Sequence, residues 1–425
     1  MKRISITLII SLVSFTLLAQ KTYIYCGKLI DVNSETVLNE ITIVVEEDKI
    51  IKVEPGYLPA LDNGIIIDLK NKVVMPGLID MHVHLEGEMS RKSYIERFTL
   101  DDADVAFQSQ VFALRNLMAG FTTVRDMGGR GVNTSLRDAI NKGLVIGPRI
   151  FSAGKALAVT GGHADPTNGW RADLMGDPGP SEGVVNGVDD CRKGVRQRYK
   201  NGADVIKITA TAGVLSMARS SSNPQFTEEE IRAIVETAAD LGMKVAAHAH
   251  GAEGMKRAIR AGVASIEHGT LMDDEVMRLM KKKGTFLVPT ITAGKSVTDS
   301  AKIKDYYPEM VTPKALEIGP KIQASFGRAY AAGVKIAFGT DAGVYKHGLN
   351  GLEFQYMVEA GMPAIETIMA ATINAAELLG ELENIGSLEP GKLADIIAVD
   401  QDPLEHIETM QNVSFVMKGG VVYKK

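Results

Sequence analysis

Cysteine is scarce in this chain, with Cys26 and Cys191 the only two among 425 residues. That number excludes a small fold held together by several disulfides. The two cysteines fall in different parts of the expected fold, so we expect buried small side chains and no bridge. Long runs of lysine and arginine are also missing, and the formal net charge is −5. A nucleic-acid partner therefore has no electrostatic support.

Apolar runs long enough to span a membrane are missing too, and the longest apolar stretch lies near the start. The stretch from Ile4 to Leu18 is mainly apolar, follows Lys2 and Arg3, and precedes the small residue Ala19. This order is typical of a secretory signal peptide at residues 1–19. The stretch is shorter than the roughly 20 apolar residues of a membrane-spanning helix. We therefore expect cleavage, export to the periplasm or the medium, and no stable membrane anchor, with a retained anchoring helix as the alternative.

The pattern of apolar residues gives the two ends of the remaining chain a common character. Residues 20–76 and 390–425 contain short β-branched runs between turns, such as ITIVVEEDKIIKVE and VSFVMKGGVVYK. The Gly419-Gly420 pair fits a two-residue hairpin turn. These ends predict one small β-sandwich domain that is formed from both termini.

The middle of the chain, residues 77–389, alternates strand-like and helix-like segments. Thr227 and Glu230, for example, form a capping box ahead of one helical segment. Eight strand-like runs occur, in VVMPGLIDMHVH, FTTVRDM, PRIFSAG, ADVIKIT, KVAAHAH, ASIEHG, TFLVPT and VKIAFGTD. This alternation predicts an α/β fold of the (β/α)8 TIM-barrel type. An open doubly wound sheet is the alternative, but it would more often show a glycine-rich phosphate loop after its first strand.

Polar side chains follow many of these strand-like runs at the same end. His82 and His84 lie two residues apart and share one face of a strand, although such a pair alone equally fits a solvent-facing surface. The complete set with this placement is His82, His84, Lys207, His248, His268 and Asp341. Barrel enzymes carry their chemistry at the carboxyl ends of the strands, so we expect these side chains to meet there.

Four imidazoles, a carboxylate and a lysine at one place describe a site for divalent metal. Lys207 is the unusual member, because metal ions would repel its ammonium and burial favours the neutral amine. Reaction with CO2 would convert this amine into a carbamate, an anionic ligand able to bridge two metals. A structural ion pair and a Schiff-base lysine are the alternatives for Lys207.

With these residues the chain resembles the amidohydrolase superfamily, and more narrowly its imidazolonepropionase-like and prolidase-like dipeptidase branch. The motifs that carry the resemblance are MPGLIDMHVHLEG, GADVIKITATAGV, VAAHAHG, SIEHGT and FGTDAG, and it extends from Tyr23 to Tyr423. It implies two divalent metal ions, with zinc as the default. By this resemblance His82, His84 and Asp341 would bind the more buried ion. His248 and His268 would bind the other, a carbamate on Lys207 would bridge both, and association into a homo-oligomer is common among such barrels.

The resemblance also implies a reaction. A metal-bridging hydroxide would attack an amide or peptide bond of a small substrate, with Asp341 as general base and then as general acid. A dipeptide or an N-acyl amino acid is the expected substrate. Opening of a cyclic amide or lactone, or hydrolysis of a phosphoester on the same metals, is the enzymatic alternative. A scaffold barrel without catalysis is the alternative from another class of protein.

Five residues in loops or near strand ends are candidates for contacts with the substrate. His163, in TGGHADP, would polarise the substrate carbonyl or stabilise the oxyanion, unless a backbone carbonyl satisfies its ring. His250 would bind a substrate carboxylate or support the metal ligands. Arg219 and Arg171 are able to grip a carboxylate, although solvated loop charges are more common. His347 would line the pocket or brace its loop.

Overall fold

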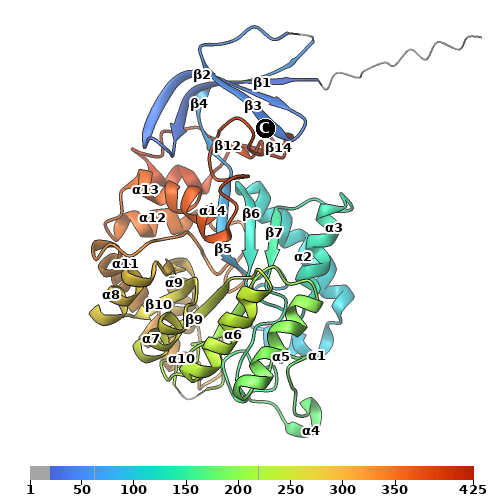
Figure 1. The fold of residues 1–425 in the computed structure, drawn as a ribbon, viewed down its shortest axis with the longest axis vertical. Coiled ribbons are helices and arrows are strands. Elements are labelled where there is room, and N and C mark those ends of the chain that lie inside the picture. The colour runs from blue at the N-terminus through green and yellow to red at the C-terminus, as the bar shows by residue number, and fades with distance from the viewer. Residues whose placement is uncertain (1–19, 62, 219) are drawn as a thin grey trace, which may run out of the picture.

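The computed structural model describes residues 20–61, 63–218 and 220–425. The expected signal peptide at residues 1–19 and the candidate Arg219 lie outside the described residues. A β-sheet built from both ends of the chain occupies one end of the molecule, and the alternating middle forms the larger body beneath it (Figure 1).

One seven-stranded sheet unites the two termini. Its order is β14-β13-β12-β4-β1-β2-β3. The strands are β1 (Thr22–Asp31), β2 (Thr36–Glu46), β3 (Lys49–Pro55), β4 (Ile65–Pro76), β12 (Ile396–Val399), β13 (Phe415–Lys418) and β14 (Val421–Lys424). Ile50 N donates to Lys392 O at 2.9 Å, so edge strand β3 also contacts the segment before β12. Alternate side chains of β1, such as Ile24 and Cys26, belong to one apolar cluster with residues of the other strands of this sheet.

The middle of the chain is a closed barrel of parallel strands. Two hydrogen-bonded groups, β5-β6-β7 and β8-β9-β10-β11, supply most of it. The strands are β5 (Leu78–Val83), β6 (Phe121–Asp126), β7 (Arg149–Ser152), β8 (Ile206–Thr209), β9 (Val245–Gly251), β10 (Ser265–Leu271) and β11 (Phe286–Val288). A parallel bridge between Leu157 and Ile208 joins the groups, and bridges at Ile336 and Ala342 place the last run between β11 and β5. The expected (β/α)8 barrel is confirmed.

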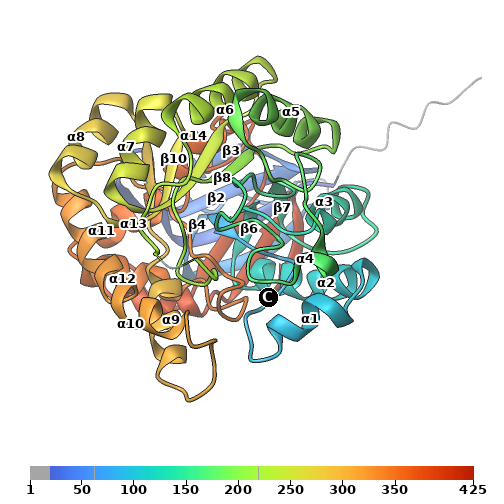
Figure 2. The ribbon, with the colours of Figure 1, turned by 90° about the horizontal axis from the view of Figure 1, so that it is seen from below.

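Helices surround the barrel strands when the molecule is seen along its long axis (Figure 2). They are α1 (Ser93–Thr99), α2 (Asp102–Met118), α3 (Val132–Asn141), α4 (Ala172–Met175), α5 (Gly187–Lys200), α6 (Glu228–Asp240), α7 (Ala252–Ala261), α8 (Asp274–Lys283), α9 (Ile291–Ala301), α10 (Thr312–Ile318), α11 (Lys321–Ala331), α12 (Leu352–Glu359), α13 (Ala364–Ala370) and α14 (Ile373–Leu379), with a 3-10 helix at Ile407–Gln411. Thr227 and Glu230 form the expected capping box of α6. Within the described ranges, no helix is long and apolar enough to cross a bilayer.

Two apolar clusters position the functional region. The barrel core packs the strands against the surrounding helices and contains Cys191. A separate, smaller cluster, here called the outer cluster, consists of Val214, Val297, Ala301, Tyr307, Val311, Ala315 and Ile318. It joins the loop after β8 to α9 and α10. Cys26 and Cys191 are both buried and free, as expected.

Candidate active site

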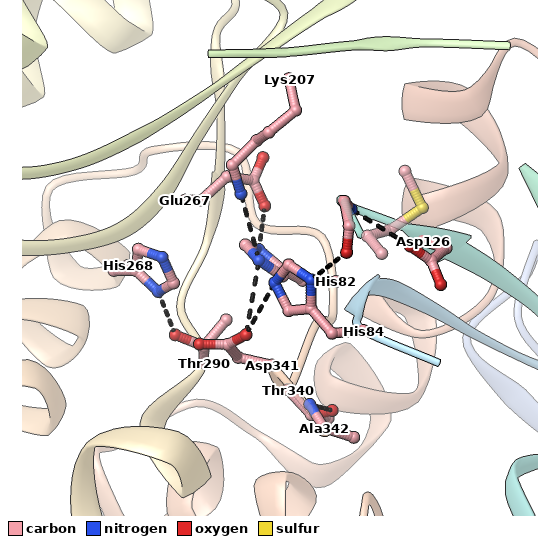
Figure 3. A network of polar contacts seen from close by, with 12 residues as sticks. His82, His84, Asp126, Lys207, Glu267, His268, Thr290, Thr340, Asp341 and Ala342 are labelled. Atoms are coloured by element: carbon pink, nitrogen blue, oxygen red, sulfur yellow. Dashed lines mark hydrogen bonds and ion pairs between the residues drawn. The ribbon is translucent and has the colours of Figure 1, made fainter. Parts of the chain in front are cut away.

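Polar side chains that follow several barrel strands lie close together, among them His82, His84, Lys207, His268 and Asp341 (Figure 3). Lys207 Nζ lies 3.2 Å from His82 Nε2. Asp341 Oδ1 lies 3.3 Å from His84 Nε2 and 3.6 Å from His82 Nε2. Since β5 and β8 are not neighbours in the barrel, the contact between His82 and Lys207 crosses the barrel interior.

The second histidine pair lies beside the first. The ring centroids of His248 and His268 are 4.6 Å apart, and those of His82 and His268 are 5.0 Å apart. One ligand atom each from His82, His268 and Asp341 lies within 4.8 Å of the others. Imidazole nitrogens with carboxylate oxygens are the donors that zinc and similar ions prefer, so this group fits a divalent metal. These three residues, with His84, Lys207 and His248, line one cavity of about 570 Å³.

Hydrogen bonds fix which ring nitrogen of each histidine faces the cavity. His84 Nδ1 donates to Gly128 O at 2.7 Å, and His248 Nε2 donates to Ala212 O at 3.3 Å. His268 Nδ1 lies 2.7 Å from the hydroxyl of Thr290. A ring nitrogen that donates its hydrogen leaves the opposite nitrogen unprotonated and able to bind metal. The rings are therefore oriented before any ion arrives.

Glu267, which is not among the candidates selected from the sequence, completes this support. His82 Nδ1 donates to Glu267 Oε2 at 2.8 Å, and Arg125 Nη2 donates to Oε1 at 2.8 Å. Burial alone would raise the pKa of Glu267, but Arg125 and His82 hold that pKa at about 2. The signal in the sequence is the spacing of Ser265 and Glu267, two polar residues that share one face of β10 inside an apolar run.

Three residues at this end of the barrel have left-handed backbones without being glycine. The φ angles are 70° at His268, 56° at Thr290 and 59° at Asp341. Such conformations are strained for these residue types and persist only where the surroundings impose them. Asp341 N donates to His82 O at 2.7 Å, and the neighbouring Thr340 hydroxyl donates to buried Asp80 at 2.6 Å. The strain turns ligand side chains toward the cavity where a regular strand would not.

Burial favours the uncharged forms of His82 and Lys207. It lowers the pKa of His82 to about 4 and that of Lys207 to about 8. In the described part of the chain no acidic side chain forms an ion pair with Lys207, which argues against a purely structural ion pair. A neutral Lys207 amine is the form that reacts with CO2 or with a carbonyl group.

His163 and His250 also line the cavity. The His163 ring stacks on His248 with centroids 4.4 Å apart. Burial lowers the pKa of His163 to about 3, so its ring is neutral. Its buried Nδ1 has no hydrogen-bond partner among the described residues, contrary to the alternative of a ring satisfied by a backbone carbonyl. His250 Nδ1 lies 2.8 Å from the hydroxyl of Thr270.

Two of the expected substrate contacts, Arg171 and His347, are not among the residues that line the cavity. The Arg171 side chain is 75% exposed and pairs with Asp173. His347 is buried, its Nε2 donates to Gly87 O at 3.1 Å, and its Nδ1 accepts from Asn116 Nδ2 at 3.0 Å. The ring of His347 therefore braces its loop from behind, because both nitrogens already have partners.

Comparisons with known proteins agree with this geometry. The model of the amidohydrolase family matches residues 73–423. The ochratoxinase of Aspergillus niger is 34% identical over an alignment that covers 96% of this chain and 87% of the relative. A solved Xaa-Pro dipeptidase with methionine bound in its active site is 52% identical, with a TM-score of 0.93 and coverage of 96% of this chain and 100% of that one. A prolidase solved in complex with N-methylphosphonate-L-proline is 33% identical, with a TM-score of 0.87 and coverage of 96% and 100%.

Proposed function

The chain belongs to the amidohydrolase family, whose members are metal-dependent, and it is a hydrolase of carbon–nitrogen bonds; from this premise we propose that it cleaves a dipeptide or an N-acyl amino acid. The observation that carries the proposal is the convergence of two histidine pairs and Asp341 around Lys207 in one cavity. The similarity to a Xaa-Pro dipeptidase and to a prolidase supports a substrate with two amino-acid residues.

The donor set supports two divalent ions, with zinc as the default. His82, His84 and Asp341 would hold one ion, and His248 and His268 would hold the other. Lys207, as a carbamate, would be shared by both ions. The position of its Nζ beside His82 supports this role. When bound, such ions lower the pKa of a water molecule and polarise the amide carbonyl.

The protein's own residues would then move the protons. Burial alone would raise the pKa of Asp341, but His82 and His84 lower it below its usual range, so the carboxylate is ionised at neutral pH. It would accept a proton from the attacking water and pass it to the departing amine nitrogen. His163, with a neutral ring, would donate its one N–H to the carbonyl oxygen as negative charge develops there.

Turnover of a substrate library by the metal-loaded protein tests the proposal. The library contains dipeptides and N-acyl amino acids, with a cyclic amide, a lactone and a phosphotriester for comparison. We expect release of free amino acids, abolished by a chelator and restored by zinc. Hydrolysis of only the comparison compounds would overturn the choice of substrate. Inactivation by borohydride with substrate, together with indifference to chelators, would favour the Schiff-base lysine.

The state of Lys207 has its own test. Metal loading in the presence of ¹³C-labelled CO2 should give a carbamate signal in the ¹³C spectrum of the wild-type protein. Lys207→Met should lack this signal and should bind less metal. Full metal binding by the wild type without any carbamate signal would show that Lys207 has another role.

We also propose that the protein is exported. The basic residues Lys2 and Arg3, the apolar stretch after them and the small residue Ala19 support this proposal. Cell fractionation and the mass of the mature N-terminus test it. A full-length protein that stays in the cytoplasm would overturn it.

A further inference from the structure

The residues that line the cavity include an apolar group and a charged group, and the part of the cavity beside each group is here called a half. One half is apolar and is lined by Val214, Leu215, Val297, Ile318, Ile322 and Val344. The other half is charged and is lined by Asp102, Arg130, Lys155 and Glu182. The apolar residues follow β8, β11 and the last barrel strand, whereas Arg130 and Lys155 follow β6 and β7. An amide bond at the metal ligands would therefore have an apolar wall on one side and a charged wall on the other.

Two separate pieces of chain supply the outer-cluster part of the apolar wall. Val214 comes from the loop after β8, and Val297 and Ile318 come from α9 and α10. All three belong to the outer cluster, which is distinct from the barrel core. The width of this half of the cavity therefore depends on how firmly the two pieces are held together.

Lys314, on α10, connects the two pieces. Its Nζ donates to three backbone carbonyls of the loop after β8, those of Gly213 at 3.3 Å, Ser216 at 2.5 Å and Ala218 at 2.8 Å. The residue is only 7% exposed. Burying an ammonium is costly unless hydrogen bonds compensate for the lost hydration. An apolar side chain of similar length would fill the same space without that cost, but it could not bind the three carbonyls of the loop. The lysine is therefore suited to fixing the path of this loop.

The same loop also fixes His163. A Cβ atom built on Gly213 would lie 2.1 Å from Cε1 of His163, so the glycine backbone packs directly against the imidazole. Because Lys314 binds the carbonyl of Gly213, it fixes both the position of the loop that forms part of the apolar wall and the position of the His163 ring.

We propose that Lys314 is a positioning residue that holds the apolar wall closed, and that the half-cavity behind this wall receives the hydrocarbon side chain of the substrate. The charged half then faces the ionic end of the same substrate. The inference rests on the proposed amide hydrolysis and adds the class of substrate to it: an amide with a bulky apolar group on one side.

Two series of dipeptides test the inference with the metal-loaded, full-length protein. In the Xaa-Gly and Gly-Xaa series, Xaa runs from alanine through valine to leucine and phenylalanine. For the wild type we expect kcat/KM to rise in one series, by about fourfold per added methylene. In Lys314→Met the rise should flatten, mainly through higher KM, while the alanine peptide changes least. Lys314→Arg should restore part of the preference, and Lys302→Met, which changes an exposed lysine, should match the wild type.

The results of the two dipeptide series distinguish failure of this inference from failure of the proposed amide hydrolysis. A wild type that hydrolyses all these peptides at equal kcat/KM overturns the apolar half-cavity but leaves amide hydrolysis standing. A wild type that hydrolyses none overturns the proposed function. An unchanged slope in folded Lys314→Met overturns the role of the lysine. If Lys314→Met does not fold, Val297→Thr tests the apolar wall instead. A hydroxyl in the wall should reduce the rise of kcat/KM with the size of the apolar side chain.

A readout without turnover completes the test. Hydrogen exchange in residues 213–218 should be faster in folded Lys314→Met than in the wild type, because three carbonyl contacts are lost. L-Leucine should raise the Tm of the metal-loaded wild type more than glycine does, and this difference should shrink in the variant. Equal Tm shifts by both amino acids in the wild type would contradict an apolar half-cavity.

Discussion

His82 and Glu267 form a buried hydrogen bond of 2.8 Å across the barrel interior, from Nδ1 of the imidazole to Oε2 of the carboxylate. Arg125 Nη2 donates to the other carboxylate oxygen, so Glu267 links β5, β6 and β10 beneath the candidate metal ligands. The orientation of His82 is therefore set from the core of the barrel and not from its solvent-facing loops.

Loss of the Glu267 carboxylate should weaken metal binding. In Glu267→Gln the imidazole of His82 loses an anionic partner that raises its basicity and fixes its tautomer, so we expect about 10- to 100-fold lower metal affinity. Metal content after dialysis against graded chelator concentrations measures the change. Glu253→Gln, at an exposed pair with Arg257, should match the wild type. Equal metal retention by both variants would contradict the role of Glu267.

The meeting of the six candidate donors in one cavity could be predicted from the sequence, because each follows an apolar strand-like run. Local pattern and family motifs therefore indicated them without knowledge of the tertiary structure. Glu267 was missed for a physical reason: it precedes His268 directly, and neighbours in a regular strand face opposite ways. The left-handed backbone of His268 breaks that alternation, and no periodicity encodes such a break.

Loops gave the weakest predictions. Arg171 and His347 were selected by residue type, but the direction of a loop side chain depends on tertiary contacts such as those of Asp173 and Asn116. Lys314 had no signal, because a lysine on a helix normally reads as solvated charge. The barrel and the terminal sheet were easier to predict, because the regular spacing of buried apolar residues indicates where strands and helices lie.

Removal of the Asp341 carboxylate should reduce turnover more than metal binding. In Asp341→Asn the amide accepts no proton, so we expect kcat to fall by about 100- to 10,000-fold while most metal is retained. Single-turnover rates and metal content of the same preparation check this. Asp204→Asn, which removes a pair with Arg137 away from the cavity, is the control. Near-normal turnover in Asp341→Asn would exclude the proton-transfer role.

Displacement of His163 by a single methyl group should lower kcat. The Gly213 backbone lies so close to the His163 ring that alanine cannot fit unless one of them moves. We expect Gly213→Ala to fold and to lose up to about 100- to 1,000-fold in kcat, the range of a lost oxyanion donor. Gly179→Ala is the control, because nothing lies within 4 Å of the added Cβ.

The double variant then gives a sharper answer. If Gly213→Ala acts through His163, adding it to His163→Ala should cost little more than either change alone. Additive losses would show that the methyl group disturbs the site by another route.

Glu353 should make the stability of the protein fall as pH rises. This buried carboxyl group accepts backbone hydrogens of Ile291 and Thr292 at 2.7 Å each, beside the Thr290 that contacts His268. Burial raises the pKa of Glu353 from 4.5 to about 8. Between these values the folded protein keeps the proton while the unfolded chain has lost it, so unfolding releases a proton. The free energy of unfolding then falls by up to about 1.4 kcal/mol per pH unit across this window and levels off above pH 8.

Glu353→Gln isolates this contribution, because an amide cannot titrate. Urea unfolding of wild type and variant between pH 5 and 9 should show the largest difference in the free energy of unfolding at the acidic end. That difference should shrink, by the slope given for Glu353, as the pH approaches 8, since only the wild type depends on this proton. Glu359→Gln, at an exposed position on the same helix, should retain the pH dependence of the wild type. A wild-type-minus-variant difference that stays constant with pH would mean that Glu353 is already ionised in the folded protein, with its hydrogen bonds to α9 outweighing the cost of burial.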